Sequence, residues 1–289
     1  MKIPSDIVLL VMDHGIGDHY IVAGFAEAIR KKFGLRVWVA GRKDLAFIAG
    51  LFPAAERYLE WPKNIKADSV GDIWIRGGSI FYSHFPRLEL MRAVGYNGFH
   101  FLDAYRCRLG LPVEAQLSAA KRPDAASVAA ACERIRELGF TPGRTVVLNI
   151  DSRTTLTTGV EPEFWTALGE RLKEQGLEPL VNAGPATRIP EGLRSVSLNL
   201  PDFRATVVAA GAICSVRSGV SDLTCDLPCA RVVVYPDCEY WSGRMIEAVG
   251  FDRFGLAEMP VEVLVTPSTA QERSREIAEQ LQARLPIAA

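Results

Sequence analysis

Residues 7–18 read IVLLVMDHGIGD, and this stretch decides the fold. The apolar residues 7–12 predict a buried strand, and the turn at 14–18 follows after one aspartate. Apolar side chains then recur at helical spacing as far as Phe33, where Gly34 provides a stop. A strand, a turn of small residues and a helix N-terminus direct backbone N–H groups and the positive end of a helix dipole toward an anion. The stretch therefore predicts a parallel α/β unit whose turn handles a phosphate or a sugar.

A second loop of this kind lies in the other half of the chain. Residues 215–222 read SVRSGVSD and stand between a strand-like segment and a helical pattern. Strands are expected at 7–12, 36–40, 72–75, 145–150, 179–182, 212–216 and 231–235, with helical patterns between them. Two blocks of such alternation predict two parallel-sheet α/β domains that face each other across a ligand cleft. We expect an N-terminal domain at 1–120 and a C-terminal domain at 121–289.

The composition narrows the partners and the compartment. The chain has 289 residues, 48% of them hydrophobic, and a net charge of −1, so no global field attracts nucleic acid and we expect no nucleic-acid partner. The six cysteines form no C-x-x-C pair, which predicts reduced thiols, a cytoplasmic location and no metal site. The apolar run at 7–12 is too short for a signal peptide or a membrane span.

Three segments occur in an order that matches one enzyme family. They are Gly15–Asp18 with its helix, the strand 146–149 with the later Pro162-x-x-Trp165, and residues 209–223, which read AAGAICSVRSGVSDL. In this order they resemble the heptosyltransferase-like glycosyltransferases, which are related to the ADP-heptose:lipopolysaccharide heptosyltransferases and have the GT-B fold.

The resemblance implies an α/β protein with two Rossmann-like domains and a metal-independent, inverting glycosyl transfer. A sugar would move from a nucleotide-diphosphate donor to a cell-surface glycan or glycolipid, such as lipopolysaccharide or capsule. The N-terminal domain would take the acceptor and the C-terminal domain the nucleotide-sugar, with no other cofactor. The family fold also allows the last helix to pack back on the N-terminal domain, and peripheral association with the inner membrane. The chain departs from the family pattern at Arg217, where an acidic residue is usual, at Asp222, where a histidine is usual, and in having no lysine just before Pro162.

Asp18 is the candidate catalytic base. Sugar transfer needs a base for the acceptor hydroxyl, and such a group contributes about 10²–10⁴-fold to the rate. An aspartate before a helix is also a common N-cap that accepts backbone N–H bonds, so both roles are open. Gly17 in the same turn is a candidate amide donor to phosphate.

The second loop supplies candidate donor ligands. Arg217 can bind a diphosphate through two hydrogen bonds, with Ser218 and Gly219 adding a hydroxyl and an amide. Asp222 either contacts donor hydroxyls or forms an ion pair with Arg217 that only braces the loop. Tyr235, Tyr240 and Trp241, at the end of the last clear strand and after it, are candidates for stacking on a nucleobase.

The loop after strand 145–150 is a third candidate, because open α/β sheets bind ligands at the carboxyl ends of their strands. Arg153, Thr154 and Thr155 combine a cation with two hydroxyls, which suits phosphate, and Asn149 ends the strand. An ordinary polar loop is the alternative. His19, His84 and His100 are candidate acceptor contacts, although a single histidine is more often packed or on the surface.

Two other functions remain open. A nucleotide-sugar epimerase or hydrolase with the same fold would turn over the donor without an acceptor. A catalytically degenerate binding or scaffold protein would bind nucleotide without turnover, which the missing lysine before Pro162 and the arginine at position 217 make worth testing. A dehydrogenase is disfavoured, because the first turn lacks the third glycine of the dinucleotide fingerprint.

Overall fold

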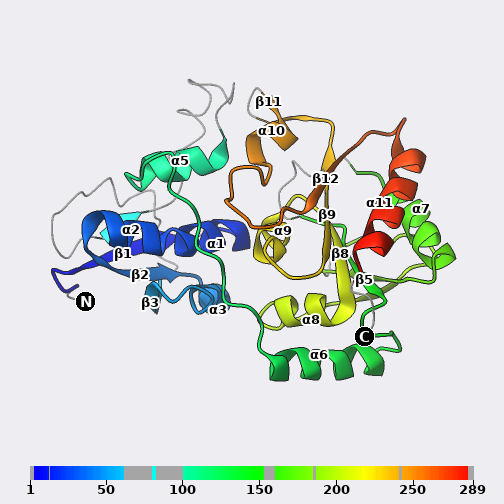
Figure 1. The fold of residues 1–289 in the computed structure, drawn as a ribbon, viewed down its shortest axis with the longest axis horizontal. Coiled ribbons are helices and arrows are strands. Elements are labelled where there is room, and N and C mark those ends of the chain that lie inside the picture. The colour runs from blue at the N-terminus through cyan, green and yellow to red at the C-terminus, as the bar shows by residue number, and fades with distance from the viewer. Residues whose placement is uncertain are drawn as a thin grey trace. The chain divides into compact units, whose positions relative to one another are not determined.

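The computed structural model describes residues 3–12, 14–61, 80–82, 100–152, 160–184, 187–240 and 243–285. The chain divides into two compact units (Figure 1). Unit 1 consists of Met1–Lys121, Trp241–Gly243 and Glu247–Ala257. Unit 2 consists of Arg122–Tyr240, Arg244–Ile246 and Glu258–Ala289.

Unit 1 is built on a parallel sheet. Within its described residues the strand order is β3-β2-β1-β4, for β1 (Ile7–Met12), β2 (Arg36–Gly41), β3 (Ala55–Glu60) and β4 (Ile80–Tyr82). All six residues of β1 are buried, as their apolar character predicts for a central strand. The helices are α1 (Ile16–Gly24), α2 (Ala26–Phe33), α3 (Ala46–Ala49), α5 (Phe101–Arg108) and the 3₁₀ turn η1 (Lys43–Leu45). The strand expected at 72–75 lies outside the described residues.

Unit 2 holds a longer parallel sheet of order β12-β9-β8-β5-β6-β7 in the part of the chain described. The strands are β5 (Thr145–Asn149), β6 (Glu178–Asn182), β7 (Arg194–Val196), β8 (Gly211–Val216), β9 (Ala230–Pro236) and β12 (Val261–Val265). The chain proceeds outward from β5 to β7 on one side and from β8 to β12 on the other. This is the strand order of dinucleotide-binding sheets, and such sheets bind ligands at the carboxyl ends of the two central strands, here β5 and β8.

Helices cover both faces of this sheet (Figure 1). They are α6 (Ala125–Glu137), α7 (Pro162–Glu174), α8 (Phe203–Ala210), α9 (Gly219–Thr224) and α11 (Ala270–Arg284). The short strand β10 (Glu239–Tyr240) belongs to unit 2, whereas β11 (Gly243–Arg244) and the helix α10 (Met245–Val249) contain residues of both units. Trp165 of α7 and Leu281 of α11 share one core cluster with strand residues such as Val232. Pro162 opens α7, where its missing N–H costs no hydrogen bond.

The predicted fold class, two parallel-sheet α/β domains, is confirmed. The last helix, α11, belongs to unit 2. Its apolar face, Ile277, Ala278 and Leu281, is buried in the core of unit 2. The segment that returns to unit 1 is Glu247–Ala257, which precedes β12.

Candidate functional site

Asp18 lies in the first turn of α1, directly after the carboxyl end of β1. Its Oδ2 accepts the N–H of Gly15 at 3.1 Å, which makes it a helix cap. Its Oδ1 accepts the hydroxyl of Tyr105, on α5, at 2.5 Å. The capping role expected for Asp18 is therefore present, and the side chain is only half-buried, so the carboxylate keeps acceptor capacity for a further donor.

The first turn has a negative group where an anion was expected to bind. The carboxylate of Asp18 already takes the N–H of Gly15, and Gly17 is buried in the helix. A bound phosphate would be repelled by this carboxylate, so the geometry does not favour the phosphate contact predicted for Gly17. The turn therefore presents a carboxylate that accepts hydrogen bonds from Gly15 and Tyr105.

His19 follows Asp18 and is 1% exposed. Its Nδ1 donates to the carbonyl oxygen of Gly15 at 2.9 Å, and its Nε2 is buried without a hydrogen-bond partner in the described chain. Nε2 lies against Gly41, where a Cβ would come within 2.3 Å of it. Burial lowers the pKa of His19, more than the nearby Asp18 raises it, so the ring is held neutral. The acceptor contact expected for His19 is therefore replaced by an internal one.

His100 is equally buried, at 1% exposed. Its Nδ1 accepts the N–H of Leu102 at 3.2 Å and caps α5, while Nε2 donates to the carbonyl of Gly250 at 2.8 Å. Both ring nitrogens thus serve the packing of unit 1, which contradicts the acceptor contact expected for His100. His84 lies outside the described residues.

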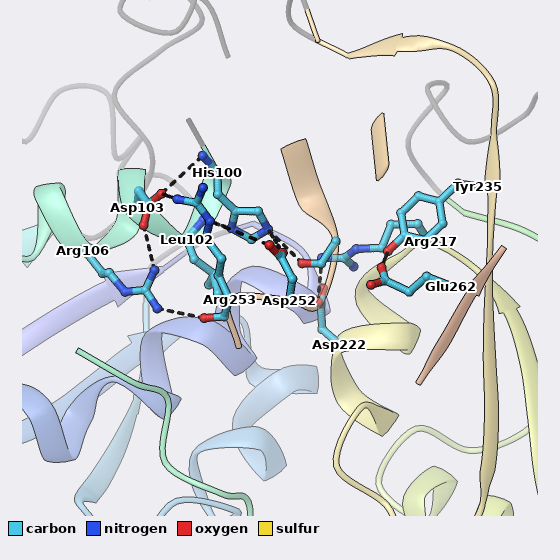
Figure 2. Close-up of polar contacts among 11 residues, drawn as sticks. His100, Leu102, Asp103, Arg106, Arg217, Asp222, Tyr235, Asp252, Arg253 and Glu262 are labelled. Carbon is cyan, nitrogen blue, oxygen red and sulfur yellow. Dashed lines mark hydrogen bonds and ion pairs between the residues drawn. The ribbon is translucent and has the colours of Figure 1, made fainter. Parts of the chain in front are cut away.

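A charged network joins α5 to the returning segment of unit 1 (Figure 2). The carboxylate of Asp103 pairs with Arg106 at 2.7 Å and with Arg253. Arg106 also donates to the carbonyl oxygens of Ala115, at 2.7 Å, and Arg253, at 2.9 Å. Sequence reasoning missed this network because its partners stand about 150 positions apart; only the His100–Asp103 capping spacing was a local signal.

The carboxyl ends of β5 and β6 carry asparagines that form a hydrogen bond with each other. Asn149 ends β5 beside Ser215 of β8. Its Oδ1 accepts the amide of Asn182 at 2.9 Å and its Nδ2 donates to the carbonyl of Asp151 at 3.1 Å. Asn149 therefore shapes the start of the next loop. Arg153, Thr154 and Thr155, the phosphate candidates of that loop, lie outside the described residues.

Arg217 follows β8 and is buried. Its Nη2 lies 2.8 Å from Oδ1 of Asp222, and its Nη1 donates to the carbonyl of Ser218 at 3.0 Å and to the hydroxyl of Ser221 at 3.1 Å. Burial opposes the charge, but the carboxylate of Asp222 and other negative groups outweigh it and raise the pKa of Arg217. Of the two roles considered for this pair, the loop-bracing ion pair is the one present.

A second buried pair lies near Arg217 (Figure 2). The hydroxyl of Tyr235, at the end of β9, donates to the carboxylate of Glu262 on β12. Burial raises the pKa of Tyr235 well above its ordinary value, although the charge of Arg217 works in the other direction. Tyr235 is fully buried, so it cannot stack on a nucleobase as considered above.

Ser218 and Gly219 remain partly exposed at the carboxyl end of β8. The N–H of Ser218 donates to the hydroxyl of Ser221 at 2.9 Å. The hydroxyl oxygen of Ser218 itself is buried and has no hydrogen-bond partner in the part of the chain described. A hydroxyl left unpaired in this way has a free-energy cost that a ligand can remove.

Two further observations concern ions and membranes. Among the described residues no group of three or more histidine, cysteine or acidic side chains could hold a metal ion. The same residues include no helix with the length and apolar character that crossing a bilayer requires.

Solved structures share this architecture. A glycosyl transferase of family 9 from Veillonella parvula has a TM-score of 0.61 and 12% identity, over 96% of this chain and 90% of that one. The E. coli heptosyltransferase WaaC with ADP has a TM-score of 0.58 and 15% identity, over 95% and 99%. The iron-containing heptosyltransferase TibC with ADP-D-β-D-heptose has a TM-score of 0.58 and 13% identity, over 98% and 76%.

The chain has the GT-B fold. No protein-family model matches its sequence, and a sequence search of curated proteins finds no match. In this GT-B chain, Asp18 lies at the carboxyl end of the first strand of unit 1, and Arg217 and Ser218 lie at the carboxyl end of β8 in unit 2.

Proposed function

We propose that this protein is a glycosyltransferase that moves a sugar from a nucleotide-diphosphate donor to a glycan or glycolipid acceptor. The proposal rests on the position of Asp18 in a GT-B fold. Its half-buried carboxylate lies just after β1 and accepts hydrogen bonds from the N–H of Gly15 and the hydroxyl of Tyr105. The solved structures of similar fold with ADP and with ADP-D-β-D-heptose support a nucleotide-sugar as the donor.

In the proposed reaction Asp18 takes the proton of the acceptor hydroxyl. The acceptor oxygen then bonds to the anomeric carbon as the bond from that carbon to the diphosphate breaks, and the nucleoside diphosphate leaves with the bonding electrons. Attack opposite to the leaving group inverts the anomeric carbon. A positioned base contributes about 10²–10⁴-fold to such a step.

The donor diphosphate would bind at the carboxyl ends of β5 and β8, where the strand order of unit 2 reverses. The unpaired hydroxyl of Ser218 and the amide of Gly219 are its proposed ligands, with Arg153, Thr154 and Thr155 from the neighbouring loop. Arg217, Asp222 and Asn149 would hold these loops in place rather than contact the phosphates. This set needs no metal ion to meet the charge of the diphosphate, because an arginine and N–H and O–H donors can do so.

The proposed acceptor is a cell-surface glycan, such as lipopolysaccharide or capsule, extended in the cytoplasm with peripheral contact to the inner membrane. All six cysteines are free thiols, which fits a reducing compartment.

The first experiment is a thermal-shift screen against ADP-, GDP-, UDP- and CDP-sugars. A ligand present at 100 times its dissociation constant stabilises the fold by about 2.7 kcal/mol, which gives a readable shift. The variant Ser218→Ala should weaken the shift, whereas Ser195→Ala, on the exposed strand β7, should leave it unchanged.

The outcomes separate the candidate functions. A shift with one nucleotide-sugar, followed by transfer to an acceptor that Asp18→Asn abolishes, supports the proposal. Turnover of that donor without an acceptor would instead indicate an epimerase or hydrolase. Binding without any turnover, or no shift at all, would point to a degenerate binding protein.

A further inference from the structure

Tyr105 and Asp18 are joined by a hydrogen bond within unit 1. The phenol hydroxyl donates to Oδ1 of Asp18 at 2.5 Å, while Oδ2 accepts the N–H of Gly15 at 3.1 Å. One donor belongs to the aspartate's own turn and the other to α5, an element 87 positions away in the chain. Hydrogen bonds to an ionised carboxylate are shorter and stronger than neutral ones, so the two donors together fix the plane of the carboxylate.

The phenol ring is itself fixed. Tyr105 is buried, and its ring packs edge-on against Phe101 with 6.2 Å between centroids and an interplanar angle of 82°. A buried ring of this kind cannot swing away without opening a cavity. The direction of its hydroxyl is therefore set by the position of α5.

The position of α5 is set in turn by the segment Glu247–Ala257. His100 caps the helix and donates to the carbonyl of Gly250, and Asp103 binds Arg106 within the helix and Arg253 in the segment (Figure 2). Arg106 is buried and completes the contact through the carbonyl of Arg253. The carboxylate of Asp18 is thus held by a helix with fixed ends.

The carboxylate still has room for a substrate. A carboxylate offers about four lone-pair positions, and the two donors take about two of them. An acceptor hydroxyl can donate to a remaining position without displacing either donor.

We infer that Tyr105 is a positioning residue that aims the carboxylate of Asp18 at the acceptor hydroxyl. The inference rests on the proposed function, in which Asp18 is the base. In this role Tyr105 acts through its hydrogen bond to Asp18.

The test compares Tyr105→Phe with the matched variant Tyr58→Phe. Tyr58 is also in unit 1, and its hydroxyl donates at 2.6 Å to the carbonyl of Arg42, so both variants lose one phenol hydrogen bond. The primary readout is the ¹³C resonance of the Asp18 carboxyl in protein labelled at aspartate Cγ, assigned by its loss in Asp18→Asn. We expect Tyr105→Phe to move this resonance and Tyr58→Phe to leave it in place, with both variants folded by circular dichroism.

The second readout is transfer from ADP-D-β-D-heptose, or from whichever nucleotide-sugar the thermal-shift screen selects. Misplacing a reacting group by about 1 Å can cost about 100-fold in rate, so we expect kcat to fall about 10- to 100-fold in Tyr105→Phe while the KM for the donor stays unchanged. Tyr58→Phe should keep both values.

Two outcomes would overturn the inference, and they are distinguishable. An unmoved Asp18 resonance in Tyr105→Phe would show that the contact does not position the carboxylate, whatever the reaction is. A second outcome is a moved resonance in Tyr105→Phe together with full activity of Asp18→Asn. It would show that Asp18 is not the base, and it would overturn both the positioning role of Tyr105 and that part of the proposed function.

Discussion

Arg217 and Asp222 form an ion pair in which each side chain is only 5% exposed, with 2.8 Å between Nη2 and Oδ1. The pair closes the turn between β8 and α9, because Arg217 also holds the carbonyl of Ser218 and the hydroxyl of Ser221. Its guanidinium is therefore engaged inside unit 2. The pair acts on function through the shape of the loop that carries Ser218 and Gly219.

Removing one partner of this pair should destabilise unit 2. Asp222→Ala leaves a buried guanidinium without its carboxylate, and changes of this kind cost about 3–5 kcal/mol. Urea denaturation should show the loss. Glu133→Ala breaks the exposed pair with Arg136 on α6 and should have a far smaller effect. Equal losses in the two variants would contradict the burial argument.

Asp18→Asn should separate binding from chemistry. The amide keeps an oxygen that can accept from Gly15 or Tyr105, so the fold and the nucleotide-dependent thermal shift should persist. Transfer should fall by about 10²–10⁴-fold, because the amide cannot take a proton. The matched control is Asp124→Asn, since Asp124 also caps a helix, accepting the N–H of Ser127 at 2.7 Å. If the transfer rate is unchanged in Asp18→Asn, then Asp18 serves as a helix cap and is not the catalytic base.

Gly41→Ala should strain unit 1. The added Cβ would lie 2.3 Å from both His19 Nε2 and the carbonyl oxygen of Met12, so strand or helix must shift. Overpacking of this kind costs about 1–3 kcal/mol in the free energy of unfolding. Gly184→Ala, whose Cβ would meet only the Thr187 hydroxyl at 3.6 Å, is the control and should change stability by less than about 0.5 kcal/mol.

His19 should make stability depend on pH. Its pKa is lower in the folded chain than its ordinary value of 6.5, so the unfolded chain binds more protons as the pH falls. Stability from this group is fully present above pH 6.5 and is lost as the pH drops through 6.5 toward the folded pKa. For one proton, the free energy of unfolding can change by at most about 1.4 kcal/mol per pH unit.

The measurement is urea denaturation at a series of pH values from about 7.5 to about 5, which begins above the ordinary histidine pKa of 6.5 and extends below it. His19→Asn can retain the N–H bond to Gly15 and should flatten the slope, whereas His14→Asn, at an exposed position, should not. An identical slope in wild type and His19→Asn would exclude His19 as the source.

The strand–turn–helix pattern at 7–18 and the alternation in the second half predicted the fold class correctly, because buried parallel strands read as continuous apolar runs. Strands with mixed composition, such as β3 (AERYLE) and β12 (VEVLV), were missed. In the part of the chain that the structure describes, both strands lie at an edge of their sheets, and charged residues within them, such as Glu56 of β3 and Glu262 of β12, interrupt the apolar pattern.

The candidate site was predictable only in part. The helix cap of Asp18 and the ion pair of Arg217 with Asp222 could be predicted, because in each case the two bonded residues are at most five positions apart in the chain. Tyr105 was not predictable as a partner of Asp18, nor Arg253 as a partner of Asp103, because folding alone brings these residues together. His19 and His100 misled for a related reason: sequence shows a titratable ring but not its burial.

Because residues Glu247–Ala257 belong to unit 1, recombination within the gene can separate parts of one folding unit. Unit 1 is encoded by three stretches of the gene, and the last one supplies Arg253 and the carbonyl of Gly250 to α5, which is encoded in the first. A recombination event near residue 121 that replaced the first half of the gene would keep the old segment and bring in a foreign α5. We therefore expect the first and the last of these stretches to vary together, and a hybrid of this chain with a relative to keep the contacts of α5 when both come from the same parent.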